Sequence, residues 1–263
     1  GFSVSTGVVV ALYLAATWFD IKRFALLVGL TEMTGMLGGA LGEMILSHVV
    51  SSGFGWRGAV SIIAVAGFFL AIAAWIFVYD SPAHYCQEQK NIQTTASSIT
   101  FKQLMMVLSI PQVWLVGLYS SLLFAILSAF ASLWSVQFFM HVQGLSFNWA
   151  AFDSGLIFVG AALGSPFMGY WSDRLRRRCI PMQISSLMCL LTLGLMVYVP
   201  HLSSFLLMLL SLLLGVSASG YVVPFAFVGD MINPCLRATA MGLTNMLCIL
   251  LGAPLFQPLI GWL

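Results

Sequence analysis

Two nearly identical pentapeptides, GLTEM at residues 29–33 and GLTNM at residues 242–246, stand 213 residues apart in this sequence. They differ at one position, where the first has Glu32 and the second has Asn245. Five letters alone could agree by chance. Whether they record an internal repeat therefore depends on the residues around them.

The residues around the two pentapeptides also repeat. Upstream of each copy an acidic residue is followed by a basic one, and the two sets are Asp20 with Arg23 and Asp230 with Arg237. Downstream, a Gly-Ala pair recurs at the same offset, at residues 39–40 and 252–253. Such long-period similarity predicts a chain built from two parallel halves, an arrangement typical of membrane transporters.

The composition indicates that the solvent of this chain is a lipid bilayer. Of the 263 residues, 60% are hydrophobic and 7% are charged, whereas soluble domains carry about 25% charged residues. The net charge of +2 and the lack of a basic tract give no sign of a nucleic-acid partner. Five cysteines without a CxxC pair predict free thiols rather than a metal site or a disulfide framework, so neither a metal nor a cofactor is expected.

Eight apolar segments approach the length of about 20 residues that a membrane-spanning helix needs. They are residues 1–17, 24–48, 57–79, 111–136, 149–171, 180–199, 203–229 and 238–261. The predicted fold class is all-α, a polytopic membrane helix bundle. Because the sequence starts and stops inside apolar stretches, we expect it to be an internal fragment of a longer protein.

The basic residues give the bundle an orientation. With alternate loops on one side, nine of the ten Lys and Arg residues fall on the same face and only Arg57 on the other. The positive-inside rule makes the first face cytoplasmic. The polar residues 81–110 then form a cytoplasmic linker between two bundles, because they contain Ser, Thr and Gln without a long apolar run.

The loop between the fifth and sixth segments reads GSPFMGYWSDRLRRRC, at residues 164–179. It resembles the signature loop of the major facilitator superfamily, in which a glycine, an aspartate and a basic cluster follow at fixed spacing. The matching residues here are Gly169, Asp173, Arg174, Arg177 and Arg178. The family usually has a second glycine where this chain has Arg176. WFDIKRFALLVGLTEMTGMLGGALGE, GWRGAV and VYDSP, which begin at residues 18, 55 and 78, also resemble this family.

The resemblance implies an incomplete two-half transporter whose eight segments are the family's fourth to eleventh spans. Residues 1–80 would then end the N-terminal half and residues 111–263 would form most of the C-terminal half. It also places Asp173 opposite the helix that starts near Lys22 and Arg23, where the carboxylate could bind the helix N-terminus as a latch. The alternative is that the basic cluster only sets topology. The rim pairs Asp20 with Arg23 and Asp230 with Arg237 are weaker gating candidates.

Ionisable residues inside spans are functional candidates by default, and Glu32 is the strongest. It lies about 12 Å into its span at 1.5 Å per residue. Because burial disfavours a charged carboxyl, Glu32 could bind and release a proton, while Asn245 offers hydrogen bonds. The alternative is a neutral Glu32 that only packs between helices. Glu43 and Asp153 lie nearer the outer side, and Asp153 could simply reach water.

Other residues are assigned to the cavity wall or to packing. Cavity candidates at middle depth are Tyr119, Ser120, Ser121, Ser217, Ser219 and Tyr221. Two glycine stripes are expected to pack against each other across the halves. They are Gly35, Gly38, Gly39 and Gly42 in one span and Gly155, Gly160 and Gly164 in another.

These features predict a secondary transporter that moves a small organic solute by alternating access with proton coupling. We expect a monomer in the inner membrane of a bacterium. No Lys or Arg lies in the middle of a span, which favours a neutral, zwitterionic or cationic solute. A non-transporting receptor or scaffold on the same fold is the alternative. An enzyme is disfavoured, because the sequence has neither HExxH nor GxSxG.

Overall fold

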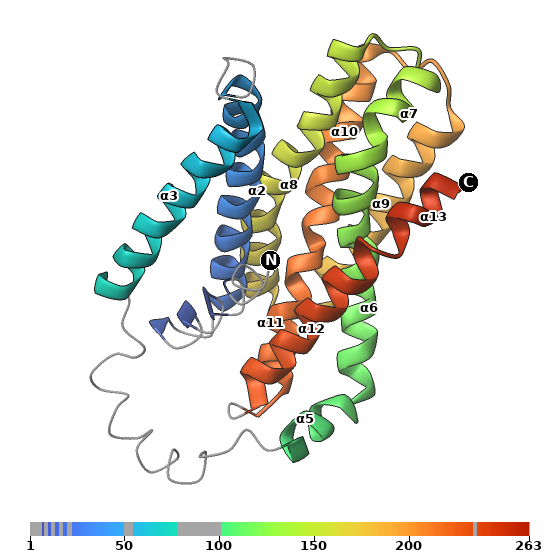
Figure 1. Cartoon of the computed structure of the whole chain (residues 1–263). Helices are drawn as coiled ribbons and strands as arrows, with labels where there is room; N and C mark the ends of the chain where they lie inside the picture. Colours follow the sequence, from blue (N-terminus) through green and yellow to red (C-terminus); the bar gives the residue numbers. More distant parts are fainter. Residues whose placement is uncertain are drawn as a thin grey trace.

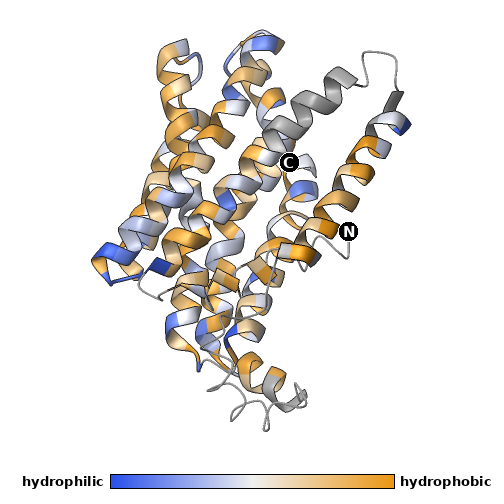
Figure 2. Cartoon of the chain, turned by 90° about the vertical axis from the view of Figure 1, so that its left-hand side faces the viewer, coloured by the Kyte–Doolittle hydropathy of each residue, from blue (hydrophilic) through white to orange (hydrophobic). Residues whose placement is uncertain are grey.

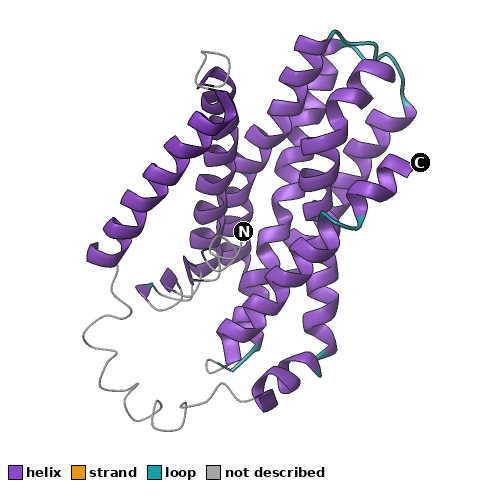
Figure 3. Cartoon of the chain, viewed as in Figure 1, coloured by secondary structure: helices purple, strands orange, loops and turns teal. Residues whose placement is uncertain are grey.

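The computed structural model describes residues 7, 10, 11, 14, 15, 18, 19, 23–49, 55–77, 101–233 and 236–262. The side chains of residues 39–49, 55, 56, 59, 77 and 101–103 are outside this description. Most of the expected span 1–17, the linker residues 81–100 and Asp20 also lie outside it. Within the described part every element is helical and no strand occurs, as Figure 3 shows.

The helices follow the apolar segments closely. The elements are α2 (Phe24–Val49), α3 (Gly55–Phe77), α5 (Phe101–Leu108), α6 (Pro111–Ala125), η3 (Ile126–Trp134), α7 (Ser135–His141), α8 (Phe147–Leu175), α9 (Cys179–Tyr198), α10 (Ser204–Ala218), η4 (Ser219–Val222), α11 (Val223–Met231), α12 (Arg237–Gly252) and α13 (Phe256–Trp262). The short helix α5 occupies the end of the segment expected to be a linker.

Five continuous helical stretches of the described residues are long and apolar enough to cross a membrane. They are Pro111–His141, Phe147–Leu175, Cys179–Tyr198, Ser204–Met231 and Arg237–Trp262. The helices α2 and α3 add 26 and 23 residues. Figure 2 shows mostly apolar residues along the coloured parts of these helices. These helices confirm the predicted all-α membrane helix bundle. The physical reason for helices is that a chain in lipid must satisfy its backbone hydrogen bonds internally.

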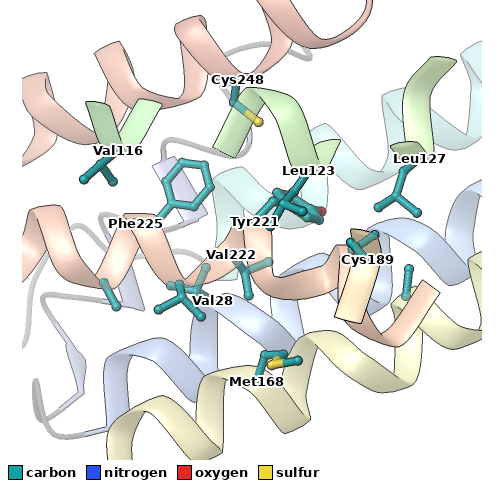
Figure 4. Close-up of a cluster of buried hydrophobic side chains, with 14 of the residues drawn as sticks. Val28, Val116, Leu123, Leu127, Met168, Cys189, Tyr221, Val222, Phe225 and Cys248 are labelled. Atoms are coloured by element: carbon teal, nitrogen blue, oxygen red, sulfur yellow. The ribbon is translucent and has the colours of Figure 1, made fainter. Parts of the chain in front are cut away.

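Helix α2 connects the early part of the chain to the bundle that follows. In Figure 1 it lies between α3 and α8, with α6, α10 and α12 beyond α8. The outer surface of α3 carries large apolar side chains such as Trp75, which is 87% exposed. The packed core contains Phe24 and Val28 of α2 together with Phe225 and Val222, all at most 2% exposed. Figure 4 shows part of this core.

Glycine and a backbone carbonyl bring α2 and α8 into direct contact at two places. A Cβ atom on Gly29 would lie 2.2 Å from the carbonyl oxygen of Ser165, and one on Gly169 would lie 2.2 Å from that of Ala25. No side chain fits at either position. Since the partner number falls on α8 as it rises on α2, the two helices are antiparallel.

The expected contact between two glycine stripes is not what joins these helices. A Cβ atom on Gly35 or Gly38 would meet nothing within 4 Å in the described part of the chain. Gly160 and Gly164 instead face α10, where their Cβ atoms would approach Leu212 and Val216. Residues four apart share one helix face. Ser165 and Gly169 therefore define the face of α8 that meets α2, and Gly160 and Gly164 define another face, which meets α10.

Candidate functional site

A part-buried hydrogen bond joins Glu32 of α2 to the bundle. The phenolic O–H of Tyr221 donates to Oε2 of Glu32 across 2.6 Å. The two residues are 189 positions apart in sequence, and Tyr221 is 2% exposed. Both were predicted to belong to the site, and the structure brings them together.

Tyr221 sits in a break between two helices. The 3₁₀ turn η4 separates α10 from α11, and Pro224 follows it at the start of α11. Proline has no N–H to continue the hydrogen-bond ladder. The carbonyl oxygen of Tyr221 accepts a hydrogen bond from the hydroxyl of Ser120 at 2.9 Å. The ring of Phe124 lies 5.3 Å from the Tyr221 ring, so α6 holds both ends of the tyrosine.

A second set of hydroxyl groups fixes the same turn from α9. The Ser185 hydroxyl donates to the carbonyl oxygen of Ser217 at 2.5 Å. A Cβ atom on Gly220 would lie 1.9 Å from the Ser185 oxygen, so only glycine fits there. The hydroxyl of Tyr119, a cavity candidate in the sequence analysis, donates to the carbonyl oxygen of Met182 at 2.7 Å. The structure therefore assigns Tyr119 to contact with α9.

Helix α12 also contributes side chains around Tyr221. Cys248 is 2% exposed and belongs to the same core cluster as Tyr221. Figure 4 shows Cys248 and Tyr221 in one buried cluster. Asn245, one turn earlier in α12, is half-buried and is not bonded to Glu32 or Tyr221. Glu32, Tyr221, Ser120 and Cys248 thus come from four different elements.

The loop motif forms a second site at the predicted cytoplasmic end of α2. Oδ2 of Asp173 accepts a hydrogen bond from the backbone N–H of Leu26 at 2.9 Å. This N–H is among the first in α2, where no carbonyl precedes it to act as a partner. The positive end of the helix dipole also favours the carboxylate. Gly169, one turn earlier in α8, permits the close approach that this bond requires.

Arg178 links Asp173 to a third helix. It donates to Oδ1 of Asp173 at 2.5 Å, to Oδ2 of Asp230 at 2.8 Å and to the hydroxyl of Ser172 at 3.1 Å. Burial opposes the charge on Arg178, but its hydrogen bonds to the two carboxylates outweigh burial and raise the pKa of its guanidinium above the ordinary value. Arg178 is therefore a fixed positive charge between α8 and α11.

The other basic residues of the loop are differently placed. Arg174 is exposed, and one of its terminal nitrogens lies 3.4 Å from the Tyr170 hydroxyl. Arg177 is exposed. Arg176 ends α8 in the left-handed conformation with a φ of 50°. Glycine adopts that conformation without strain, which gives a physical reason for the glycine usual at this position in similar loops.

The rim pairs differ from the expectation. Asp230 binds Arg178 instead of Arg237, because Arg178 reaches it from the neighbouring loop. The Nε atom of Arg237 is buried without a hydrogen-bond partner among the described residues. Arg23 is exposed, and its expected partner Asp20 lies outside the described residues. Sequence spacing alone could not distinguish the two candidate partners of Asp230.

Two further acids were predicted near the outer side. One possibility for Asp153 was that it reaches water, but it is 1% exposed and its Oδ1 atom has no hydrogen-bond partner among the described residues. It is buried because it lies on the face of α8 that packs against the bundle. The Glu43 side chain lies outside the described residues.

The fold and the two sites define a polytopic membrane protein whose spans are tied together by buried and rim polar contacts. The model of the major facilitator superfamily matches residues 1–257, and the chain belongs to that family. Proteins of this family move small solutes across a bilayer, so the protein is an integral, multi-pass membrane transporter. No curated protein matches the chain.

Proposed function

We propose that this protein is a secondary transporter that moves a small organic solute by alternating access and couples this movement to protons at Glu32. The observation that carries the proposal is the hydrogen bond from Tyr221 to Glu32. It joins α2 to a broken helix inside the bundle, where a polar contact is costly to leave unpaired. Broken helices at middle depth are a recurring feature of transporter binding sites.

Glu32 and Tyr221 would connect the two halves of the transporter. Residues 1–80 belong to the N-terminal half in this proposal, residues 81–110 to the linker and residues 111–263 to the C-terminal half. Alternating access requires contacts that form in one state and break in the other. A carboxylate at Glu32 can only accept hydrogen bonds, whereas the protonated acid can also donate one. Protonation would therefore change the contact between the halves.

Asp173 supplies the corresponding latch at the cytoplasmic side. Its bond to Leu26 N–H and the Glu32 bond to Tyr221 both act on α2, six residues apart. Six residues of helix span about 9 Å. A rigid α2 would therefore carry a displacement from one contact to the other. In this proposal the hydrogen bond from Leu26 N–H to Asp173 is the closed form of the cytoplasmic latch.

The solute is proposed to be neutral, zwitterionic or cationic, because no Lys or Arg lies in the middle of a span. Asn245 is a candidate contact, since it is half-buried near the Glu32 site and is not bonded to Glu32 or Tyr221. The distribution of basic residues supports the proposed orientation, with the Asp173 loop on the cytoplasmic side. We propose a monomer in the inner membrane of a bacterium.

The test uses the natural protein in liposomes. A thermal-shift panel first finds a solute that raises the melting temperature, because a ligand specific to the folded state stabilises it. Uptake of that solute is then measured with and without an inward proton gradient. We expect Glu32→Gln to lose gradient-driven accumulation but to keep exchange of labelled for unlabelled solute. Unchanged accumulation in this variant would refute proton coupling at Glu32, and absence of any flux in the natural protein would favour a receptor or scaffold.

A further inference from the structure

Asp153 is a buried acid that the Glu32 site does not use. It is 1% exposed, and within the described part of the chain its Oδ1 atom has no hydrogen-bond partner. Among the described residues there are two ion pairs, and Arg178 makes both of them. Arg178 follows the end of α8 that is opposite to Asp153. A charged carboxylate that is buried without a cation or a donor is strongly disfavoured. The arrangement therefore favours a carboxyl that holds a proton.

A second buried polar group lies on the surface of α10 that faces α8. A Cβ atom on Gly215 would meet the carbonyl oxygen of Ile157, and one on Gly160 would meet that of Leu212. Counted from these two contacts, Ser211 lies between the levels of Asp153 and residue 159 on α8, so its offset from Asp153 along the helix axis is at most about 9 Å. Ser211 is fully buried, and its hydroxyl has no hydrogen-bond partner among the described residues.

No described residue near this level offers a charge to Asp153. The elements packed against α8 are α2, α7, α9, α10, α11, η3 and η4. Neither α10 nor η3 contains a titratable residue. On the other elements the titratable residues are Glu32, Glu43, His48, His141, Cys179, Cys189, Tyr198, Tyr221 and Asp230, and Arg23 directly precedes α2. Of these, His141 and Tyr198 lie toward the outer side and are exposed, and the side chains of Glu43 and His48 are outside the described residues.

Asp153 is separated from Glu32 along the bundle. Gly29 meets Ser165 and Ala25 meets Gly169, so the antiparallel register places Glu32 at the level of residue 162 on α8. Asp153 lies nine residues further outward, which corresponds to about 14 Å along the helix axis. No hydrogen bond can cross this distance, so the two carboxyls do not share one proton.

We propose that Asp153, with Ser211 on the facing surface of α10, forms a second proton-binding site in the outer half of the bundle. The step is the reversible binding of one proton by the Asp153 carboxylate, with the acid O–H directed to the Ser211 hydroxyl or to a water between them. This site does not depend on the role proposed for Glu32. The two acids would lie one above the other, with Asp153 nearer the outer solution.

Infrared spectroscopy of the natural protein in lipid tests the proposal directly. A protonated carboxyl gives a C=O stretching band that ionised carboxylates lack. We expect Asp153→Asn to remove one such band at neutral pH, Glu32→Gln to leave that band in place, and Ser211→Ala to shift its frequency. Asn matches the shape of the neutral acid, and Ser211→Ala provides the readout if Asp153→Asn does not fold.

Two results would overturn the proposal. The first is a protonated-carboxyl spectrum that is identical in the natural protein, Asp153→Asn and Ser211→Ala. The second is a rise in melting temperature with sodium chloride, but not with choline chloride, that Asp153→Asn abolishes, because it would assign the site to a metal cation. Failure of Glu32→Gln to alter transport would refute the coupling role of Glu32 and leave the Asp153 band as it is.

Discussion

The Glu32 site and the Asp173 site both hold α2, but they do so in different surroundings. Tyr221 binds Glu32 through one hydrogen bond in a buried turn, whereas Asp173 is part of a charged network that ends at the 40% exposed side chain of Asp230. A buried polar group left unpaired loses its whole solvation. A rim charge left unpaired is still partly solvated and screened by salt. A contact of the first kind can therefore sense a proton, and one of the second kind can open and close at low cost.

The largest expected effect comes from the contact that both sites share, the close approach of α2 and α8. In Gly169→Ala the new Cβ atom would meet the Ala25 carbonyl at 2.2 Å, so the helices must move apart. Overpacking typically costs about 1–3 kcal/mol, and this displacement also separates Asp173 from Leu26. We expect the transport rate to fall at least tenfold. Gly155→Ala, which meets nothing within 4 Å, is the matched control, and equal activity of the two variants would contradict the packing argument.

Removing one hydroxyl tests the buried site separately. Tyr221→Phe leaves Glu32 without its donor, which we expect to cost about 1–3 kcal/mol and to change the shape of the pH profile of uptake. Tyr119→Phe loses only a bond to a backbone carbonyl and should cost about 1 kcal/mol with the pH profile unchanged. Chemical denaturation and uptake between acidic and neutral pH would measure the two effects. Indistinguishable pH profiles for the two variants would mean that Tyr221 only packs.

The rim network should respond less and in a salt-dependent way. Arg178→Gln removes both ion pairs and leaves Asp173, whose side chain is 9% exposed, with only the Leu26 N–H. We expect a loss of about 1–3 kcal/mol at low salt, because charge-assisted hydrogen bonds are involved. Arg174→Gln, on the exposed side of the same loop, should stay within about 0.5 kcal/mol. The measurement is the melting temperature of each variant at low and at high salt. Equal changes in melting temperature for Arg178→Gln and Arg174→Gln would contradict the network explanation.

Most of the fold could be predicted from the sequence because a bilayer strongly constrains the segments that cross it. Each span must be a long apolar helix, and α6, α8, α9, α10 and α12 lie where the apolar segments were predicted. The details that sequence missed are the breaks in these helices. The 3₁₀ turn at Tyr221 depends on Pro224 and on the hydroxyls of Ser120 and Ser185, which come from other helices. Local pattern cannot specify such contacts between distant segments.

The site residues were predictable in kind but not in pairing. The cost of placing an acid in a span singled out Glu32, and loop spacing singled out Asp173. Sequence offered Arg237 as the partner of Asp230, whereas the fold supplies Arg178. It also left open that Asp153 reaches water, although Asp153 is 1% exposed. Burial on one face of a helix depends on which neighbour packs there, and an all-round apolar helix carries little information about that neighbour.

The smallest expected effect is a gain in stability at the end of α8. Arg176 has a φ of 50°, and a non-glycine residue in the left-handed region costs about 1–2 kcal/mol. Arg176→Gly removes this strain but adds flexibility to the unfolded chain, so we expect a net gain of at most about 1 kcal/mol and unchanged transport. Arg177→Gly should give no gain, because Arg177 is not among the residues with positive φ. A lower melting temperature for Arg176→Gly would show instead that the arginine side chain supports the closed latch, and would extend the network beyond Arg178.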